Sequence, residues 1–404
     1  MGSSGLSGQR KVNEDLTGYV HQLIRQLPEK VGMEYRDPTE EESDLWAKIV
    51  LALLEHRYAQ VDTMVHRMDY EILEFQSGNQ VYYLLQKTEE SDNYWGTYIF
   101  QPSACRNLII QCPHPIKDRN TGEEGIRAFV KANAFFYCLP GTNRCNREVA
   151  SPCSGTTSVC SSQKKAFRIS DVAHNDQSLF QMTTKVLHAF DSTLVFIQLH
   201  GFTKRSTDPY VILSNGTTKK PENDYIVRLA DALKQTDGQL TFKIAHEDLS
   251  WKRLRGFTNV QGRLVNGSPD PCQQEADQSE GLFIHIEQER LRLRKDSLAW
   301  DKMAKAIEMS FPCEPLSTQE KTNRQKLFFY PNPLRIASRL EMDISPYHIV
   351  HLQLFDLQGR TRIDKWYSDG EEIYVNSVEL VAGVYYFRLM TPDNFLGWGT
   401  LVVE

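Results

Sequence analysis

The chain has 404 residues, of which 46 are Lys or Arg, 52 are Asp or Glu and 40% are hydrophobic, and its formal net charge is −6. This is the composition of a globular protein, and it excludes a wholly disordered or collagen-like chain. The acidic balance argues against nucleic-acid binding, and the sequence contains no run of 18 apolar residues that would span a membrane as a helix. The length predicts two or three domains.

Cysteines are concentrated in the first half of the chain, with six of the eight between residues 105 and 160. They are Cys105, Cys112, Cys138, Cys145, Cys153, Cys160, Cys272 and Cys313. An even, clustered set favours disulfides formed in an oxidising compartment. The alternative is buried thiols with a structural zinc, but no CxxC pair is present. The long Cys/Ser/Gly/Thr-rich loop at 140–165 is expected to be functional or pinned by disulfides.

The N-terminal 36 residues are polar, and we expect residues 1–36 to form an arm before the first domain. The chain starts with a Gly- and Ser-rich stretch, residues 1–8, that lacks the apolar segment of a signal peptide. Since a secreted protein needs such a segment, we expect the signal peptide to have been removed or to be missing from this sequence.

Residues 37–313 combine helical and strand-like patterns. Thr39 and Glu42 form a capping box, and apolar residues recur at helical spacing from Leu45 to Leu54, which predicts a helix. Strands are expected at 81–85, 97–100, 108–111, 135–139, 195–199, 211–213, 240–245 and 282–286, and further helices at 123–132, 176–190, 224–235 and 297–309. This alternation predicts an α/β domain with a mixed, mostly parallel sheet flanked by helices.

The pattern of polar and apolar residues changes near the C-terminus. Residues 314–326 are polar and are predicted to be a linker. From residue 327 to residue 404 helical periodicity is absent, and strands are expected at 327–330, 350–356, 372–375, 383–390 and 397–403. Such a series of short strands predicts a separate all-β domain, built as a sandwich.

Four motifs follow one another within residues 327–404. They are Tyr330-Pro331-Asn332-Pro333, the segment LFDLQGR from Leu354, the segment LVAGVYYFR from Leu380, and the terminal TLVVE from Thr400. In order and spacing this segment resembles the type IX secretion sorting domain of Bacteroidota. The resemblance implies passage through the periplasm and across the outer membrane, with the type IX secretion machinery as a partner. The product would be secreted or held at the cell surface, usually after removal of this domain.

Two histidines follow apolar strands in the predicted α/β domain. His114 comes after the strand at 108–111, and His200 comes directly after Leu199. The carboxyl ends of parallel strands gather ligands at one edge of a sheet, so both side chains are candidate metal ligands. Asp118 is the nearest carboxylate, and two histidines with one carboxylate are a frequent zinc-ligand set in hydrolases. The rival carboxylates, Glu123 and Glu124, lie at the acidic start of the next helix.

A hydrolytic metal site also needs a general base. The strand at 282–286 runs into Glu287, which is the candidate for taking a proton from water and passing it to the leaving amine. Glu289 is the alternative base. Three arginines follow, and one of them is expected to pair with Glu287 or to hold a substrate carboxylate: Arg290, Arg292 and Arg294.

Two loop segments supply candidate substrate-binding residues. Arg144 follows the strand at 135–139, and Asp171 and His174 lie just before the helix at 176–190. At these places they would bind substrate or orient a metal ligand. The alternative is an ordinary loop turn for Asp171 and a surface ion pair for Arg144.

The order of the candidate residues resembles that of zinc hydrolases with a carboxypeptidase-like fold. These include N-formylglutamate amidohydrolases, poly-γ-glutamate hydrolases and succinylglutamate desuccinylases. A strand-end His with a nearby acidic residue (here His114 and Asp118), a second strand-end His (His200) and a late Glu (Glu287) follow that plan. The usual HxxE spacing is absent, because His114 and Asp118 are four residues apart.

The resemblance implies a secreted, zinc-dependent hydrolase that cleaves an amide or peptide bond in a peptide, a cell-wall fragment or an acylated amino acid. Two alternatives remain open. A phosphoesterase would use Arg144, Arg147 and His174 around a phosphate, and a non-enzymatic surface binding or adhesion protein would contain the histidines as structural residues. Stoichiometric bound zinc would favour the hydrolase.

Overall fold

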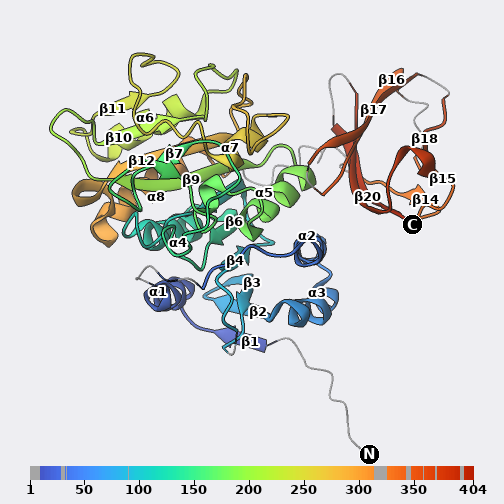
Figure 1. Ribbon diagram of the computed structural model, residues 1–404, viewed down its shortest axis with the longest axis horizontal. Coiled ribbons are helices and arrows are strands. Elements are labelled where there is room, and N and C mark those ends of the chain that lie inside the picture. The colour runs from blue at the N-terminus through green and yellow to red at the C-terminus, as the bar shows by residue number, and fades with distance from the viewer. Residues whose placement is uncertain are drawn as a thin grey trace, which may run out of the picture. The chain divides into compact units, whose positions relative to one another are not determined.

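A computed structural model describes residues 10–28, 32, 34–89, 91–313, 325–342, 347–357, 359–368, 371–391 and 395–404. The chain divides into two compact units. The first comprises Met1–Thr184 and Thr193–Glu314, and the second comprises Lys185–Ser192 and Pro315–Glu404. Figure 1 shows the helices and strands of each unit.

The first unit contains a ten-stranded mixed sheet. Its strands, in spatial order, are β1 (Arg10–Asn13), β2 (Tyr70–Ser77), β3 (Gln80–Lys87), β4 (Thr97–Phe100), β6 (Ala134–Leu139), β5 (Arg106–Gln111), β9 (Val195–Phe202), β12 (Phe283–Glu289), β10 (Val211–Ser214) and β11 (Phe242–Ile244). The four central strands, β6, β5, β9 and β12, are parallel, and β4 and β10 flank them in the antiparallel sense. A mixed sheet with a parallel centre confirms the predicted α/β class.

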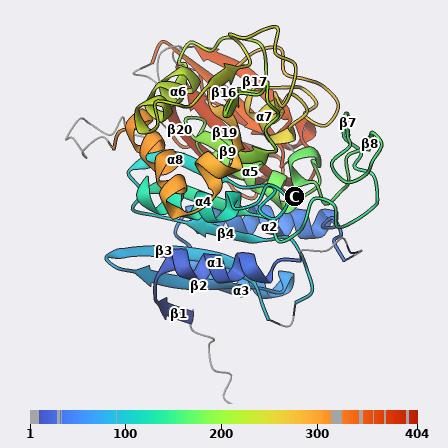
Figure 2. The same cartoon turned by 90° about the vertical axis from the view of Figure 1, so that its left-hand side faces the viewer.

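Helices cover both faces of this sheet (Figures 1 and 2). They are α1 (Leu16–Gln26), α2 (Glu40–Leu54), α3 (Tyr58–Val65), α4 (Thr121–Lys131), α5 (Leu179–Phe190), α6 (Tyr225–Thr236), α7 (Val260–Val265) and α8 (Ser297–Ser310). Only the part of α5 up to Thr184 belongs to this unit. Side chains alternate between the two faces of a strand. Ile110 of β5 therefore packs in the core with α1, α4, α6 and α8, whereas its neighbour Gln111 bonds Thr184 of α5 on the other face.

The N-terminus departs from the predicted arm. Within residues 10–26, β1 pairs with β2 and α1 buries Leu16, Val20 and Ile24 in the core. These three side chains recur every fourth residue and form one apolar stripe, which packing against the sheet stabilises. Residues 1–9, the first part of the expected arm, lie outside the described residues. The predicted capping box is confirmed, because Thr39 and Glu42 bond each other's backbone N–H groups at the start of α2.

Six cysteines form disulfides, as predicted. The pairs are Cys105–Cys313, Cys145–Cys160 and Cys153–Cys272. Cys112 and Cys138 are buried free thiols. The second and third disulfides hold the long loop between β6 and α5. The regular structure of this loop consists of short elements, the antiparallel pair β7 (Thr156–Thr157) and β8 (Lys165–Ala166) and a 3-10 turn at Val172–His174.

The second unit is all-β. Its larger sheet contains β13 (Gln325–Lys326), β20 (Phe395–Val403), β19 (Gly383–Met390), β16 (Ile349–Phe355) and β17 (Thr361–Ser368), and its smaller sheet contains β14 (Phe329–Tyr330), β15 (Ala337–Leu340) and β18 (Tyr374–Asn376). Side chains from both sheets, such as Leu340 and Phe387, share one hydrophobic core. The sequence did not predict β15 and β17, and it assigned the residues of β13 to the linker. Most of the predicted linker, residues 314–324, lies outside the described residues.

Across the described residues, no helix combines the length and the apolar character that crossing a membrane requires.

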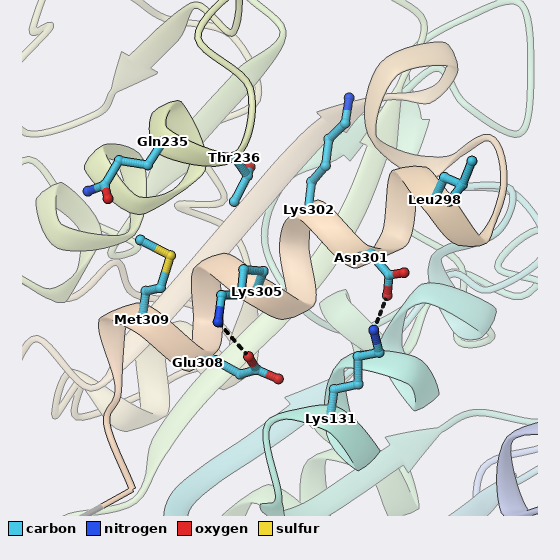
Figure 3. A pocket seen from close by; sticks show the side chains of 9 residues that line it. All are labelled: Lys131, Gln235, Thr236, Leu298, Asp301, Lys302, Lys305, Glu308 and Met309. Atoms are coloured by element: carbon cyan, nitrogen blue, oxygen red, sulfur yellow. Dashed lines mark hydrogen bonds and ion pairs between the residues drawn. The ribbon is translucent and has the colours of Figure 1, made fainter.

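A groove of about 550 Å³ lies on the helical surface of the first unit (Figure 3). We call it the helix groove, and it is lined by Lys131, Gln235, Thr236, Leu298, Asp301, Lys302, Lys305, Glu308 and Met309. Asp301 pairs with Lys131 at 2.6 Å, and Glu308 pairs with Lys305 at 3.4 Å. The acidic side chains of the groove therefore already have basic partners.

Candidate metal centre

The candidate metal centre lies at the carboxyl ends of the four central strands. In the parallel pair β9–β12, His200 is opposite Glu287 and Gln198 is opposite His285. His114 follows β5, and Arg144 follows β6. Because neighbouring parallel strands end at the same edge of the sheet, side chains from distant parts of the sequence meet there. We call His114, Asp118, His200 and Glu287 the strand-end cluster.

Three ligand atoms of this cluster form a nearly equilateral triangle. His114 Nδ1 lies 3.2 Å from Asp118 Oδ2 and 3.2 Å from His200 Nδ1, and His200 Nδ1 lies 3.3 Å from Asp118 Oδ2. All three side chains are buried. A tetrahedral zinc site with metal–ligand distances of about 2.0–2.1 Å places its ligand atoms about 3.3–3.4 Å apart. The triangle therefore has the size of one face of such a site.

The outer nitrogen of each histidine has its own acceptor. His114 Nε2 lies 2.8 Å from Asp171 Oδ1, and His200 Nε2 lies 2.7 Å from Gln198 Oε1. The Gln198 amide nitrogen donates to Gln111 and Gln261, which fixes its oxygen toward His200. Protons on both Nε2 atoms leave lone pairs on both Nδ1 atoms, so the inner edge of the cluster consists of acceptors. Converging lone pairs of this kind favour a bound cation.

The charge states also suit a metal. Burial alone raises the pKa of Asp118, but His114 and His200 outweigh it and hold that pKa well below its usual range. Burial lowers the pKa of His200 to about 4, which keeps the ring neutral. For His114, burial and Arg144 lower the pKa, yet Asp171 and Asp118 leave it above its ordinary value. A proton and a metal would therefore compete for His114.

Asp171 connects the predicted substrate-binding residues to His114. Its Oδ1 accepts from His174 Nδ1 at 2.9 Å as well as from His114, and its Oδ2 accepts from Arg144 Nε at 2.9 Å and from Arg144 Nη2. The remaining nitrogen, Arg144 Nη1, lies 3.2 Å from His114 Nδ1. His174 stacks on Phe167 with the ring centroids 3.6 Å apart. Asp171 thus orients a candidate ligand, and Arg144 points one donor toward the cluster.

Glu287 is buried beside these ligands. Within the described part of the chain, its Oε2 has no hydrogen-bond partner. Burial and then the charge of Asp118 raise its pKa to about 8, although Arg144, Arg294 and Arg253 oppose this shift. A buried carboxyl group that shares a site with a carboxylate is a candidate proton carrier.

The rival carboxylates, Glu123, Glu124 and Glu289, do not join the strand-end cluster. Glu124 Oε2 accepts from Gln288 Nε2 at 2.8 Å, and neither Glu123 nor Glu124 belongs to a described group that could hold a metal together with the histidines. Glu289 accepts from the backbone N–H groups of Leu291 and Arg292, which makes it a cap of the turn at 290–294.

The three arginines after Glu289 differ in exposure and in the contacts they make. Arg290 is exposed, and Arg292 pairs with Asp237 at 2.7 Å. Arg294 donates to the backbone oxygens of Asp118, at 2.9 Å, and Arg119, and so holds the loop that carries a candidate ligand. A Cβ at Gly201 would lie 2.1 Å from Arg294 Cζ, so this arrangement requires glycine there.

Two residues of the site were missed by the sequence analysis. Gln198 precedes His200 by two positions and His285 precedes Glu287 by two, so each pair points to one face of its strand. The ring centroids of His285 and His200 are 4.4 Å apart, and His285 Nδ1 is buried without a partner among the described residues. Polar residues at alternate positions of otherwise apolar strands were the available signal.

A cavity of about 400 Å³ opens above the cluster. Its floor includes His114, Arg144, His174, His200, His285 and Glu287. Its walls come from the disulfide-held loop, with Thr156 and Val159, and from the loop around Arg255. The cluster is thus buried at the base of a cavity large enough for a small ligand.

Comparisons with known protein families and with curated proteins found no match. Among solved structures, the chain is similar to dimeric latent PorU from Porphyromonas gingivalis, with 16% identity and a TM-score of 0.15 over 19% of this chain and 9% of that chain. It is also similar to the product-bound cell shape determinant protein Csd4 from Helicobacter pylori, with 9% identity and a TM-score of 0.30 over 74% of this chain and 96% of that chain. TM-scores of this size do not establish a shared fold, so the site is interpreted from its own geometry.

Proposed function

We propose that the protein is a metal-dependent hydrolase that cleaves an amide or peptide bond, with zinc as the metal. The observation that carries this proposal is the triangle formed by His114 Nδ1, Asp118 Oδ2 and His200 Nδ1, with edges of 3.2–3.3 Å. Two neutral imidazoles and one carboxylate are a donor set that zinc prefers, and three protein ligands leave a coordination position for water or substrate.

The chain's own residues fit the steps of amide hydrolysis. A divalent metal, if held by the triangle, would supply Lewis-acid polarisation of the scissile carbonyl and would activate water for attack. Burial favours the protonated form of Glu287, and a bound cation beside it would favour the ionised form. In that form Glu287 takes a proton from the attacking water and returns it to the leaving nitrogen. The Nη1 group of Arg144 donates to the oxygen on which negative charge develops. Asp171 holds both His114 and Arg144 in place for this chemistry.

Metal content tests the proposal directly. The full chain is purified without chelator, titrated with zinc and analysed by mass spectrometry, alongside the double variant His114→Ala/His200→Ala. We expect about one zinc per chain in the unchanged protein and none in the variant. The control is His66→Ala, which removes an exposed histidine far along the sequence from the cluster. Thermal unfolding shows whether each variant folds.

Either of two results would contradict the proposal: absence of zinc binding in the unchanged protein, or full zinc retention in the folded double variant. The first would favour a surface binding protein. Once zinc is established, hydrolysis of peptides and acylated amino acids identifies the bond that is cleaved.

We also propose that residues 327–404 act as a type IX sorting domain, so that the hydrolase works outside the cell or at its surface. The four sequence motifs and the three disulfides support this proposal. In a bacterium with type IX secretion, the precursor of the full chain should reach the medium or the cell surface, whereas a precursor truncated after residue 326 should remain in the periplasm. Equal export of both forms would rule the sorting role out.

A further inference from the structure

A group of buried amide side chains lies behind His200. We call Gln111, Gln198, Asn259 and Gln261 the amide network, and each of them is at most 1% exposed. Gln198 is its centre: its Nε2 donates to Gln111 Oε1 at 3.0 Å and to Gln261 Oε1 at 3.2 Å, and its Oε1 accepts from Asn259 Nδ2 and lies 2.7 Å from His200 Nε2. The two ends of an amide are similar in shape but opposite in hydrogen-bonding character. The direction of these bonds is therefore decided by the groups at the edge of the network.

The first such group is the backbone carbonyl of Val172, which can only accept. Gln261 Nε2 lies 2.9 Å from this oxygen and 2.9 Å from Gln181 Oε1. Gln261 must therefore turn its nitrogen toward Val172 and its oxygen toward Gln198. That oxygen requires the nitrogen of Gln198 as its partner, so the oxygen of Gln198 is left to face His200.

The second group is the backbone carbonyl of Phe180 in α5. Thr184 Oγ1 donates to it at 3.0 Å, which leaves the Thr184 oxygen to accept from Gln111 Nε2 at 2.9 Å. Gln111 thus also turns its oxygen toward Gln198. This anchor lies on a different element from Val172, but it imposes the same direction on Gln198.

The third group is the backbone N–H of Gly262, which can only donate. Asn259 Oδ1 accepts from it at 2.9 Å and caps α7, so the Asn259 nitrogen points to Gln198 Oε1. Three backbone groups therefore agree that Gln198 presents an acceptor to His200. The hydrogen of a neutral His200 ring belongs on Nε2 as a result, and Nδ1 keeps its lone pair.

This direction matters because Asp118 competes for the same hydrogen. Asp118 Oδ2 lies 3.3 Å from His200 Nδ1. Without an acceptor behind the ring, the hydrogen would be drawn to Nδ1, where the carboxylate could accept it, and a ring nitrogen that carries hydrogen has no lone pair for a metal. The acceptor on Gln198 thus keeps both atoms available for a cation.

We propose that Gln111, Asn259 and Gln261 are positioning residues of the metal centre, which act through Gln198 to hold His200 in the tautomer that binds a cation. Their importance for hydrolysis rests on the proposed function, but the tautomer itself exists without a metal. The same segment of chain also serves the other histidine. Val172 follows Asp171 in the sequence, and Asp171 Oδ1 lies 2.8 Å from His114 Nε2.

Nitrogen-15 NMR of the histidine side chains tests the inference on the metal-free full chain at neutral pH. A ring nitrogen that carries hydrogen and one that does not differ in chemical shift, and the signals of His200 are identified by their loss in His200→Ala. In the unchanged protein we expect the hydrogen on Nε2. In Gln198→Leu, which removes the acceptor, the hydrogen should move to Nδ1, and zinc affinity should fall about 10–100-fold.

Three milder variants keep the test open if Gln198→Leu does not fold. Gln111→Leu and Gln261→Leu each remove one anchor, and Asn259→Ser removes the third while serine still caps α7. Each variant should populate both tautomers of His200 and lower zinc affinity about 2–10-fold.

Gln181→Leu is the matched control. It deletes an equally buried amide that also bonds Gln261, but it leaves all three anchors in place, so the hydrogen of His200 should stay on Nε2. This control separates the direction of the network from a general loss of packing.

Four results would overturn the inference: hydrogen on Nδ1 of His200 in the unchanged protein, an unchanged tautomer in every folded variant of the network, an equal effect of Gln181→Leu, or zinc affinity that stays constant while the tautomer changes. Absence of zinc binding together with the expected tautomers would refute the proposed function and leave the amide network as the device that sets the tautomer of His200.

Discussion

Two regions of the first unit gather charged side chains, and they differ in how those charges are partnered. In the helix groove, Asp301 contacts both Arg127 and Lys131, and its side chain is 31% exposed. In the strand-end cluster, Asp118 and Glu287 are buried. Asp118 Oδ2 lies 3.2 Å from His114 Nδ1, and Glu287 has an oxygen without a hydrogen-bond partner among the described residues. The groove is the larger of the two, at about 550 Å³ against about 400 Å³.

The comparison shows that the volume of a groove or cavity does not indicate which chemistry its side chains can perform. Exposed ion pairs are solvated, and each contributes little to stability. Buried acceptors that face one another are costly unless a cation or a proton joins them, and they persist where function requires them. Unpaired and buried polar atoms therefore distinguish the candidate site from an ordinary helix surface.

The largest effect, on the rate of hydrolysis, is expected from replacing Glu287, the proposed general base. Replacing Glu287 in the variant Glu287→Gln removes the proton carrier but keeps the shape of the side chain, so hydrolysis of the best substrate should fall about 10²–10⁴-fold. Zinc content should be unchanged. Glu308→Gln is the matched change in the helix groove and should leave hydrolysis unaffected. If both variants lost activity equally, the two regions would not differ as described.

The next largest effect, on zinc affinity, is expected from replacing Asp171, which accepts a hydrogen bond from His114. In Asp171→Asn the acceptor that orients His114 and Arg144 loses its charge, and zinc affinity should fall about 10–100-fold, as measured by competition with a chelating dye. Asp301→Asn provides the control, since it breaks the ion pairs with Arg127 and Lys131 in the groove. Similar zinc affinities in the two variants would mean that Asp171 does not position the ligand.

The position of the cluster could be anticipated from the sequence because strand ends are local features. His114 and His200 each follow an apolar run, and parallel strands align their carboxyl ends without further information. The α/β class followed from the same alternation. The helix α1 was missed because its apolar residues, Leu16, Val20 and Ile24, are sparse and stand among polar neighbours, so the helix is identified only by the sheet it packs on.

The parts of the site that could not be anticipated depend on contacts across long stretches of chain. Asp171 was a candidate from the sequence, but its contact with His114 was not anticipated, because the two lie 57 residues apart and Asp171 belongs to a loop held by the disulfides Cys145–Cys160 and Cys153–Cys272. No periodic pattern describes such a loop. The role of Gln198 depends likewise on amide partners 87 and 63 residues away, Gln111 and Gln261.

Two carboxylates should shift stability with pH in opposite directions. Burial raises the pKa of Glu124 to about 8 from 4.5, so the stability that it contributes is present below pH 4.5 and is lost as the pH rises to about 8. Hydrogen bonding to Arg127 lowers the pKa of Asp301 to about 2, so its contribution is present above pH 3.8 and is lost as the pH falls toward 2.

Chemical denaturation across pH tests this difference. Glu124→Gln stays neutral and should gain stability relative to the unchanged protein between pH 5 and 8, by at most about 1.4 kcal/mol per pH unit. Asp301→Asn should instead be less stable than the unchanged protein above pH 4, and this difference in the free energy of unfolding should shrink as the pH falls below 4. A constant difference between Glu124→Gln and the unchanged protein over pH 5–8 would show that Glu124 is not protonated in the fold.

The smallest effect is expected for an exposed pair in the helix groove. Lys305 lies 3.4 Å from Glu308 one turn along α8, and its side chain is 62% exposed. Water solvates both charges, and the pair must immobilise two long side chains, so Lys305→Ala should change the free energy of unfolding by no more than about 0.5 kcal/mol. Denaturation in urea measures this value, and zinc affinity serves as the second readout. A change above 1 kcal/mol, or any loss of zinc, would mean that the groove is coupled to the strand-end cluster through α8. The route for such coupling is the turn at 290–294, which precedes this helix and positions Asp118 through Arg294.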